Sequence, residues 1–187
     1  MEKLLDEAPV GSDGDIIVTL KAANEIKRIL EKDGDVVIEI GEKQAVFKVD
    51  STMIYSKLID GNYPNYKQVI PASFAKKISV PCSDFIDALE IVSIPLFDAS
   101  SSYVKITFTT NKLMFEANSN IGEGKEHIAI EYEGEEMSLS FNPQFLSDPF
   151  KHIGVDNVNI KINDAFSPIA IESGDGFLYV IMPMRNK

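Results

Sequence analysis

A unit of about sixty residues that repeats along the chain constrains the fold more than any other feature. Short runs of alternating apolar residues begin at Ile16, Lys77 and Met137, and each leads into a segment whose apolar residues have helical spacing. Three further runs with the period-two alternation of half-buried antiparallel strands follow every helical segment. The sequence therefore predicts a repeat of one strand, one helix and three strands that occurs three times.

The helical segments carry start signals of different kinds. Residues 23–30 have their apolar positions on one helical face, and the second segment is expected to use Cys82 or Ser83 as its cap. Asn142 is a typical N-cap for the third segment. Pro149 lies inside that segment and is expected to kink or shorten the helix, because proline lacks the amide hydrogen that the helix needs there.

Strands are expected in three groups, one after each helix. The expected ranges are 36–40, 45–49 and 53–59 in the first repeat, 103–108, 112–116 and 127–132 in the second, and 158–162, 169–171 and 177–182 in the third. A single repeat leaves sheet edges open and has one helix to cover its sheet, so two repeats are needed to close a core.

Pairing of repeats divides the chain into two expected domains. The second and third repeats, residues 73–187, form one complete domain, whereas the first repeat, residues 1–72 with an acidic N-terminal lead, has no partner within the chain. Two chains that pair their first repeats would rebuild a complete domain. A homo-oligomer is therefore expected.

The composition is that of a globular cytoplasmic protein without cofactors. The chain has 187 residues, of which 44% are apolar. No apolar run approaches the roughly 18 residues that span a bilayer, and the first residues lack the charged and apolar blocks of a signal peptide. A single cysteine and two histidines argue against a disulfide, a metal site or a redox role.

The net charge of −11 argues at first sight against nucleic acid as a partner. Proteins that bind DNA through its phosphates need clustered lysine and arginine. Net charge is an average, however, and a molecule with an acidic outer surface and a small basic inner surface can still surround DNA. The distribution of charge therefore matters more than its sum.

Three motifs resemble those of one bacterial family. Residues 56–71 read SKLIDGNYPNYKQVIP, residues 141–145 read FNPQF, and residues 179–185 read YVIMPMR. In this order and spacing, and on a repeat of this kind, they resemble the beta subunit of bacterial DNA polymerase III, the beta sliding clamp. The resemblance is specific because the first motif is long, and it covers residues from about 15 to 185.

The resemblance implies an α+β DNA clamp fold, with antiparallel sheets outside and helices on the inner face. Clamps of this family have six such repeats in three domains, and two chains close a ring. This chain resembles the last three repeats, which are the second half of the middle domain and the complete C-terminal domain. It is then either a fragment of a longer clamp or a shortened natural relative, and the sequence alone leaves both interpretations open.

The resemblance also implies a hydrophobic cleft that binds short peptides from the DNA polymerase and the clamp loader. Methionine and aliphatic side chains form an adaptable apolar slot, while Arg185 and Asn142 can fix a peptide backbone or carboxylate. A family stretch from the first half of the middle domain also lines this cleft and is absent here, so the site is expected to be incomplete. By motif position the cleft residues are Pro64, Tyr66, Val69, Asn142, Phe145, Ile169, Val180, Ile181, Met182, Pro183, Met184 and Arg185.

Contact with DNA in this family comes from basic residues on the helices that face the hole. Lys21 and Arg28 match basic family positions, and Lys27 and Lys32 lie nearby. The second helical segment carries three acidic residues and no base, which suits phosphates poorly. Contact with double-stranded DNA is therefore expected to be weak, nonspecific and salt-sensitive, with encirclement in place of affinity.

Plainer interpretations compete with both assignments. Residues 179–182 also fit a last strand that is merely buried. The basic residues of the first helical segment also fit a solvated helix face with Glu25 and Glu31 as partners.

Enzyme motifs are absent from the sequence. It has no G-x-S-x-G elbow, no phosphate-binding glycine loop and no H-E-x-x-H pair. Cys82 at a helix start is a candidate nucleophile, but a small residue that begins the helix explains it more simply. The expected function is a non-catalytic processivity clamp that tethers the replicative polymerase to DNA. The alternative is a regulatory or decoy module that binds partner peptides without encircling DNA.

Overall fold

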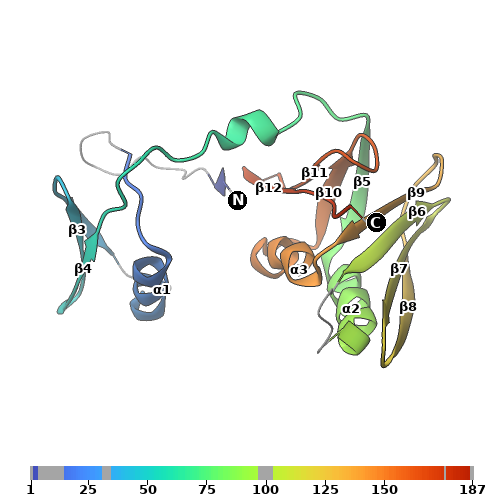
Figure 1. Cartoon of the computed structure of the whole chain (residues 1–187), viewed down its shortest axis with the longest axis horizontal. Helices are drawn as coiled ribbons and strands as arrows, with labels where there is room; N and C mark the ends of the chain where they lie inside the picture. Colours follow the sequence, from blue (N-terminus) through green and yellow to red (C-terminus); the bar gives the residue numbers. More distant parts are fainter. Residues whose placement is uncertain (1, 4–14, 31–34, 97–102, 175, 186–187) are drawn as a thin grey trace. The chain divides into compact units, whose positions relative to one another are not determined.

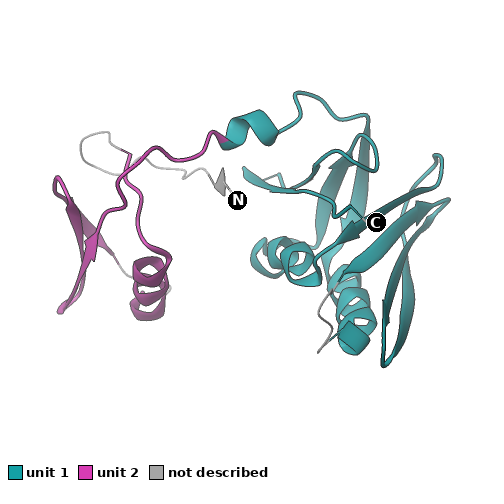
Figure 2. Ribbon diagram, viewed as in Figure 1, with its two compact units in different colours: residues 1–6, 66–187 teal, residues 7–65 magenta. Residues whose placement is uncertain are grey.

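The computed structural model describes residues 2–3, 15–30, 35–96, 103–174 and 176–185 (Figure 1). They belong to two compact units (Figure 2). The small unit is Glu7–Asn65, and the large unit is Tyr66–Lys187 together with Met1–Asp6. The division between the two units therefore falls between Asn65 and Tyr66 in the sequence, a few residues before the expected boundary at residues 72 and 73.

The small unit contains the first repeat. Thr19 caps its helix, because the Thr19 hydroxyl accepts a hydrogen bond from the Ala22 N–H over 3.2 Å. The leading segment forms one isolated bridge, Val18 with Leu58, instead of the full strand expected from Ile16. The elements are α1 (Leu20–Ile29), β2 (Val37–Ile40), β3 (Gln44–Val49) and β4 (Thr52–Lys57), with the strands in the order β2-β3-β4.

The large unit contains the second and third repeats. The second repeat consists of β5 (Lys76–Pro81), α2 (Cys82–Ser93), β6 (Val104–Thr109), β7 (Lys112–Ser119) and β8 (Gly122–Ala129). The third consists of β9 (Met137–Phe141), α3 (Pro143–His152), β10 (Asn157–Ile162), β11 (Ile169–Glu172) and β12 (Phe177–Ile181). Short 3-10 turns, η1 (Tyr66–Val69) and η2 (Ile94–Leu96), and the strand β1 (Glu2–Lys3) complete the described elements.

The second and third repeats interlock by exchanging their first strands. One sheet has the order β8-β7-β6-β9, and the other has the order β1-β12-β11-β10-β5. Strand β5 therefore pairs with β10 of the other repeat, with Val80 opposite Val158. Strand β9 pairs with β6 in the same way, with Phe141 opposite Val104. Each repeat thus closes the sheet edge that the other leaves open.

The core of the large unit lies where α2 and α3 meet the two sheets. The Phe85 ring of α2 stacks on the Phe150 ring of α3 with centroids 3.9 Å apart, and it meets Phe115 of β7 edge-on at 5.1 Å. Figure 1 shows the two helices beside each other on the same side of the sheets. Because the inward residues of both repeats share this core, neither repeat closes it alone.

Local details of the helices differ from the expectations. Neither Cys82 nor Ser83 caps α2: Pro81 occupies the N-cap position without a side-chain hydrogen bond, and the Cys82 N–H donates to the Asp156 carbonyl over 2.8 Å. Asn142 does cap α3, by accepting from the Gln144 N–H over 2.9 Å. Pro149 does not end that helix, which continues to His152.

Candidate peptide-binding site

The last described residues run beside the strand that begins the third repeat. The Met184 N–H donates a hydrogen bond to the Ser140 carbonyl of β9 over 2.7 Å. A pocket of about 370 Å³ lies between this tail and the neighbouring elements, and we call it the tail pocket. Its lining residues are Lys105, Ser138, Leu139, Ser140, Ala165, Phe166, Met182, Pro183, Met184 and Arg185.

A capped loop between β10 and β11 presents Phe166 to the tail pocket. The Asp164 carboxylate accepts hydrogen bonds from the Phe166 N–H over 2.7 Å and from the Ser167 N–H and hydroxyl over 2.8 Å each. These donors favour the ionised carboxylate and so lower the pKa of Asp164. The hydrogen bond from the Ser167 hydroxyl has the largest effect. The loop is thereby fixed, while the Phe166 side chain remains 74% exposed.

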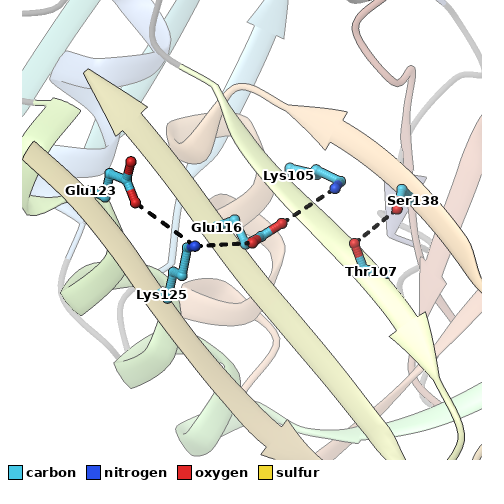
Figure 3. Close-up of polar contacts among 6 residues, drawn as sticks. All are labelled: Lys105, Thr107, Glu116, Glu123, Lys125 and Ser138. Carbon is cyan, nitrogen blue, oxygen red and sulfur yellow. Dashed lines mark hydrogen bonds and ion pairs between the residues drawn. The ribbon is translucent and has the colours of Figure 1, made fainter. Parts of the chain in front are cut away.

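A charged row on the four-stranded sheet leads to the same pocket. Figure 3 shows the Glu116 carboxylate between Lys105 and Lys125. Glu116 is 3.3 Å from the Lys105 amine and 3.9 Å from the Lys125 amine, and Glu123 is 3.8 Å from the Lys125 amine. These pairs are partly exposed and contribute little to stability. Glu116 nevertheless holds Lys105, which gives the tail pocket a second cation beside Arg185.

The structure brings only some of the expected cleft residues together. Met182, Pro183, Met184 and Arg185 all line the tail pocket. Asn142 lines a separate pocket of about 420 Å³ with residues of α2 and α3. Phe145 is exposed on α3, and Val180 is half-buried on β12.

Two of the expected cleft residues belong to the core. Ile169 is fully buried and Ile181 is 7% exposed, and both side chains pack in the large unit. The expectation that their side chains line a cleft is therefore corrected. For Ile181, the plainer interpretation of a buried last strand applies, while Met182 next to it is 56% exposed.

The remaining expected cleft residues lie near the boundary of the two compact units. Pro64 is an exposed residue of the small unit. Tyr66 and Val69 are exposed on η1 of the large unit.

Sequence reasoning missed Phe166 and Lys105. A large apolar residue in the polar stretch from Asn163 to Ser167 is a usable signal for Phe166, since a loop has no core to bury it. Lys105 gives no such signal, because a lysine at an outward position of a half-buried strand is ordinary.

The basic residues expected to contact DNA are exposed on α1. Lys21, Lys27 and Arg28 lie there, and Lys32 is outside the described residues. The Arg28 guanidinium is 2.8 Å from the Glu25 carboxylate, as the interpretation of a solvated helix face expects. The acidic residues of α2 are exposed as well, and one of them, Glu90, pairs with Lys151 of α3 at 3.2 Å.

Other kinds of site find little support in the described part of the chain. Cys82 is buried, and burial, together with the charge of Asp156, raises the pKa of its thiol above the ordinary value. Among the described residues, no three metal-binding side chains are grouped to hold an ion. None of their helices is both long and apolar enough to cross a membrane.

Comparison with the models of known protein families shows to which family the chain belongs. The family described as DNA polymerase III beta subunit, C-terminal domain, matches residues 67–185. The chain belongs to the DNA polymerase III beta subunit family. The central-domain family of the same beta subunit matches residues 3–65.

Bacterial clamps are similar to this chain over almost its whole length. The beta sliding clamp of Chlamydia pneumoniae is 32% identical over 173 residues, which are 92% of this chain and 47% of that clamp. The sliding clamp of Bartonella birtlesii, solved bound to griselimycin, is 32% identical with a TM-score of 0.83 and covers 91% of this chain and 47% of that one. These likenesses confirm the clamp fold expected from the sequence.

A third similar protein is the beta sliding clamp of C. crescentus. Its structure, solved with PEG bound to what is described as its beta-motif tethering region, is 27% identical with a TM-score of 0.85. It covers 96% of this chain and 49% of that clamp. The chain thus spans about half the length of the relatives that it matches.

Proposed function

We propose that this chain is a DNA sliding clamp component that docks short linear peptides in the tail pocket and holds a replicative polymerase on duplex DNA. The observation that carries the proposal is the pocket formed by Met182, Pro183, Met184 and Phe166 in a chain of the beta-subunit family. No catalysis is involved, because a tether acts by raising the local concentration of the polymerase at its template.

The chemistry of the tail pocket suits an apolar peptide segment beside an acceptor group. Met182 and Met184 are 56% and 44% exposed, and flexible thioether side chains adapt to peptides of different shape. Arg185 and Lys105 place two cations at the same pocket. They favour a peptide that carries a carboxylate or backbone carbonyl next to its apolar side chains.

Fluorescence anisotropy with labelled peptides tests the docking proposal. The probes are peptides tiled along the replicative polymerase and clamp loader of the source organism. A subset that binds with micromolar affinity and is displaced by its unlabelled form supports the proposal. Absence of binding across both tiled sets contradicts it.

The proposal for DNA rests on the exposed basic residues of α1. Lys27 and Arg28 lie in the last turn of that helix and Lys21 lies in its first turn, and these exposed cations are suited to weak phosphate contact. A clamp that encircles DNA stays on circular DNA and is lost when the circle is cut, so retention during gel filtration before and after linearisation tests encirclement. The loading machinery of the organism has to be present in this assay.

A second candidate function is a regulatory module that binds partner peptides without surrounding DNA. The observation that favours it is the acidic surface of α2, where Asp84, Asp87 and Glu90 are all exposed. Such a module binds the tiled peptides but is equally absent from circular and linear DNA. The retention experiment therefore separates the two functions, while the peptide experiment is common to both.

A further inference from the structure

We propose that the small unit pairs with the small unit of a second copy of this chain, through a face formed by α1 and the free edge of β2. The inference goes beyond the proposed function and does not depend on peptide or DNA binding. It rests on three comparisons between the open small unit and the closed large unit. We call the surface the α1–β2 face, and its residues are Val18, Ala23, Ile26, Leu30, Ile38 and Ile40.

The edge of β2 is open where the equivalent strands are closed. Strand β2 pairs only with β3 among the described strands, whereas β6 and β10 each have a strand on both sides. On both β6 and β10 the additional neighbour is the first strand of the other repeat. Within the described residues, strand β2 therefore lacks the kind of neighbour that interlocks the large unit.

The side chains of β2 show the same difference in burial. Ile38 lies opposite Phe47 just as Ile106 lies opposite Phe115, so the two isoleucines are equivalent. Ile106 is 0% exposed, but Ile38 is 49% exposed. Ile40 on the same strand is 53% exposed. Exposure of this much aliphatic surface in the inward positions of a sheet marks a missing partner.

The helix of the small unit borders an open groove where the large unit has a filled core. The groove has a volume of about 510 Å³ and is lined by Val18, Ala23, Ile26, Lys27, Leu30 and Phe47. When the first residues of α1 and α2 are aligned, Val18, Ala23 and Leu30 correspond to Val80, Phe85 and Val92. Those three residues of the large unit are fully buried.

A second copy fits the α1–β2 face because pairing has to be reciprocal. In the large unit each repeat gives its first strand to the other and receives one in return. The small unit has a leading segment to give, residues 16–19, and a strand edge to receive one, that of β2. In two copies related by a two-fold axis, each leading segment can therefore pair with the β2 edge of the other copy. Arg28 occupies the position in α1 that Glu90 has in α2 and Lys151 has in α3, and those two residues form an ion pair between their helices. In the proposed pair of small units, Glu25 beside Arg28 supplies the negative charge for such an ion pair.

The large unit also sets the register of the expected pairing. Its pairs Val80 with Val158 and Phe141 with Val104 translate into Val18 of one copy opposite Val36 of the other. The neighbouring pairs, Ser79 with Asn159 and Ser140 with Lys105, translate into Ile17 opposite Val37. This register makes the proposal specific enough to test residue by residue.

Sedimentation equilibrium of the full chain over micromolar to submillimolar concentrations is the first test. The chain is expected to approach twice its mass of 20.7 kDa with increasing concentration. Ile38→Asp is expected to shift the chain to the monomer, because a charge would then be buried at the pairing edge. Tyr55→Asp is the matched control, since Tyr55 is 67% exposed on the opposite face of the same sheet. A chain that stays monomeric, or an Ile38→Asp variant that stays dimeric, overturns the proposal.

Disulfide trapping tests the register without relying on a destabilising change. Ile17→Cys and Val37→Cys are made in separate chains that also carry Cys82→Ala, and the two are mixed and oxidised with diamide. The expected result is a covalent dimer in the mixture, with much less in either variant alone. Glu39→Cys, two residues away on the same strand, replaces Val37→Cys as the control. Equal trapping at positions 37 and 39, or no trapping at either, contradicts the proposed pairing.

Discussion

The Met184 N–H donates its hydrogen bond to the Ser140 carbonyl over 2.7 Å and so joins the end of the third repeat to that repeat's first strand. As a result, the tail pocket is built from segments far apart in sequence, with Lys105 and Phe166 on separate elements. A change in the pocket is therefore expected to alter ligand binding without altering the fold.

Loss of the Phe166 side chain is expected to weaken peptide binding. Phe166→Ala removes an aromatic contact from the tail pocket, and the expected loss of affinity is about tenfold to a hundredfold for a well-buried anchor. Ile121→Ala is the control, because Ile121 is 75% exposed on a turn outside the pocket, nearly as exposed as Phe166 at 74%. Anisotropy titrations measure both, and equal affinities for the two variants argue against the tail pocket as the site.

The Asp164 carboxylate is expected to position Phe166 and not to contact the peptide. Asp164→Ala removes the acceptor of the loop hydrogen bonds and should weaken binding several-fold, while Asp164→Asn keeps an oxygen acceptor and should retain most of the affinity. A loss of affinity in the asparagine variant as large as in the alanine variant would contradict a positioning role.

The lowered pKa of Asp164 also fixes the direction of a pH effect. Because the folded-state pKa lies below the ordinary value, the contribution of the carboxylate to loop order is present above that ordinary value. It is lost as the pH falls through the lower folded-state pKa. Amide exchange of Phe166 and Ser167 is therefore expected to remain protected down to moderately acidic pH.

Removal of the Phe85 ring is expected to destabilise the large unit by about 3–5 kcal/mol. Phe85 is fully buried and stacks on Phe150, so Phe85→Ala leaves a cavity between the two repeats. Phe145→Ala is the matched control, because Phe145 is 56% exposed and its truncation should change stability by less than about 0.5 kcal/mol. Urea unfolding measures the free energy of unfolding of the two variants, and amide exchange in α2 and α3 shows where the structure is weakened.

Cys82 is expected to react slowly with alkylating reagents in the native protein. Burial and the nearby charge of Asp156 raise the pKa of its thiol above the ordinary value, so little thiolate is present at neutral pH. Iodoacetamide labelling should proceed much more slowly than with free glutathione and should reach the free-thiol rate after denaturation. Rapid labelling of the folded chain would revive Cys82 as a candidate nucleophile.

Sequence patterns predicted the repeats well because alternation and helical spacing follow directly from burial. They placed the last strand of the second repeat at 127–132, whereas β8 spans Gly122–Ala129. The first half of β8 reads GEGKE and has no apolar alternation, since one side of it packs through glycine: a Cβ added to Gly124 would lie 2.5 Å from the Val92 carbonyl oxygen.

The candidate site was harder to predict than the repeats. Motif position placed residues 182–185 in one cleft, and in the structure they line one pocket because they are contiguous and follow the end of β12. It placed Ile169 in the cleft, although that side chain points into the core and Phe166, three residues earlier in the loop, lines the pocket. Which residues of a loop face a pocket depends on contacts such as those of Asp164, and no periodicity encodes them.

Methyl NMR of the chain with ¹³C-labelled methionine tests the central claim, peptide docking in the tail pocket, most directly. Addition of a binding peptide is expected to shift the methyl signals of Met182 and Met184, which line the pocket, and to leave those of Met53 and Met114, which are exposed elsewhere, unchanged. Shifts confined to Met53 or Met114, or no shift at saturating peptide, would contradict the account.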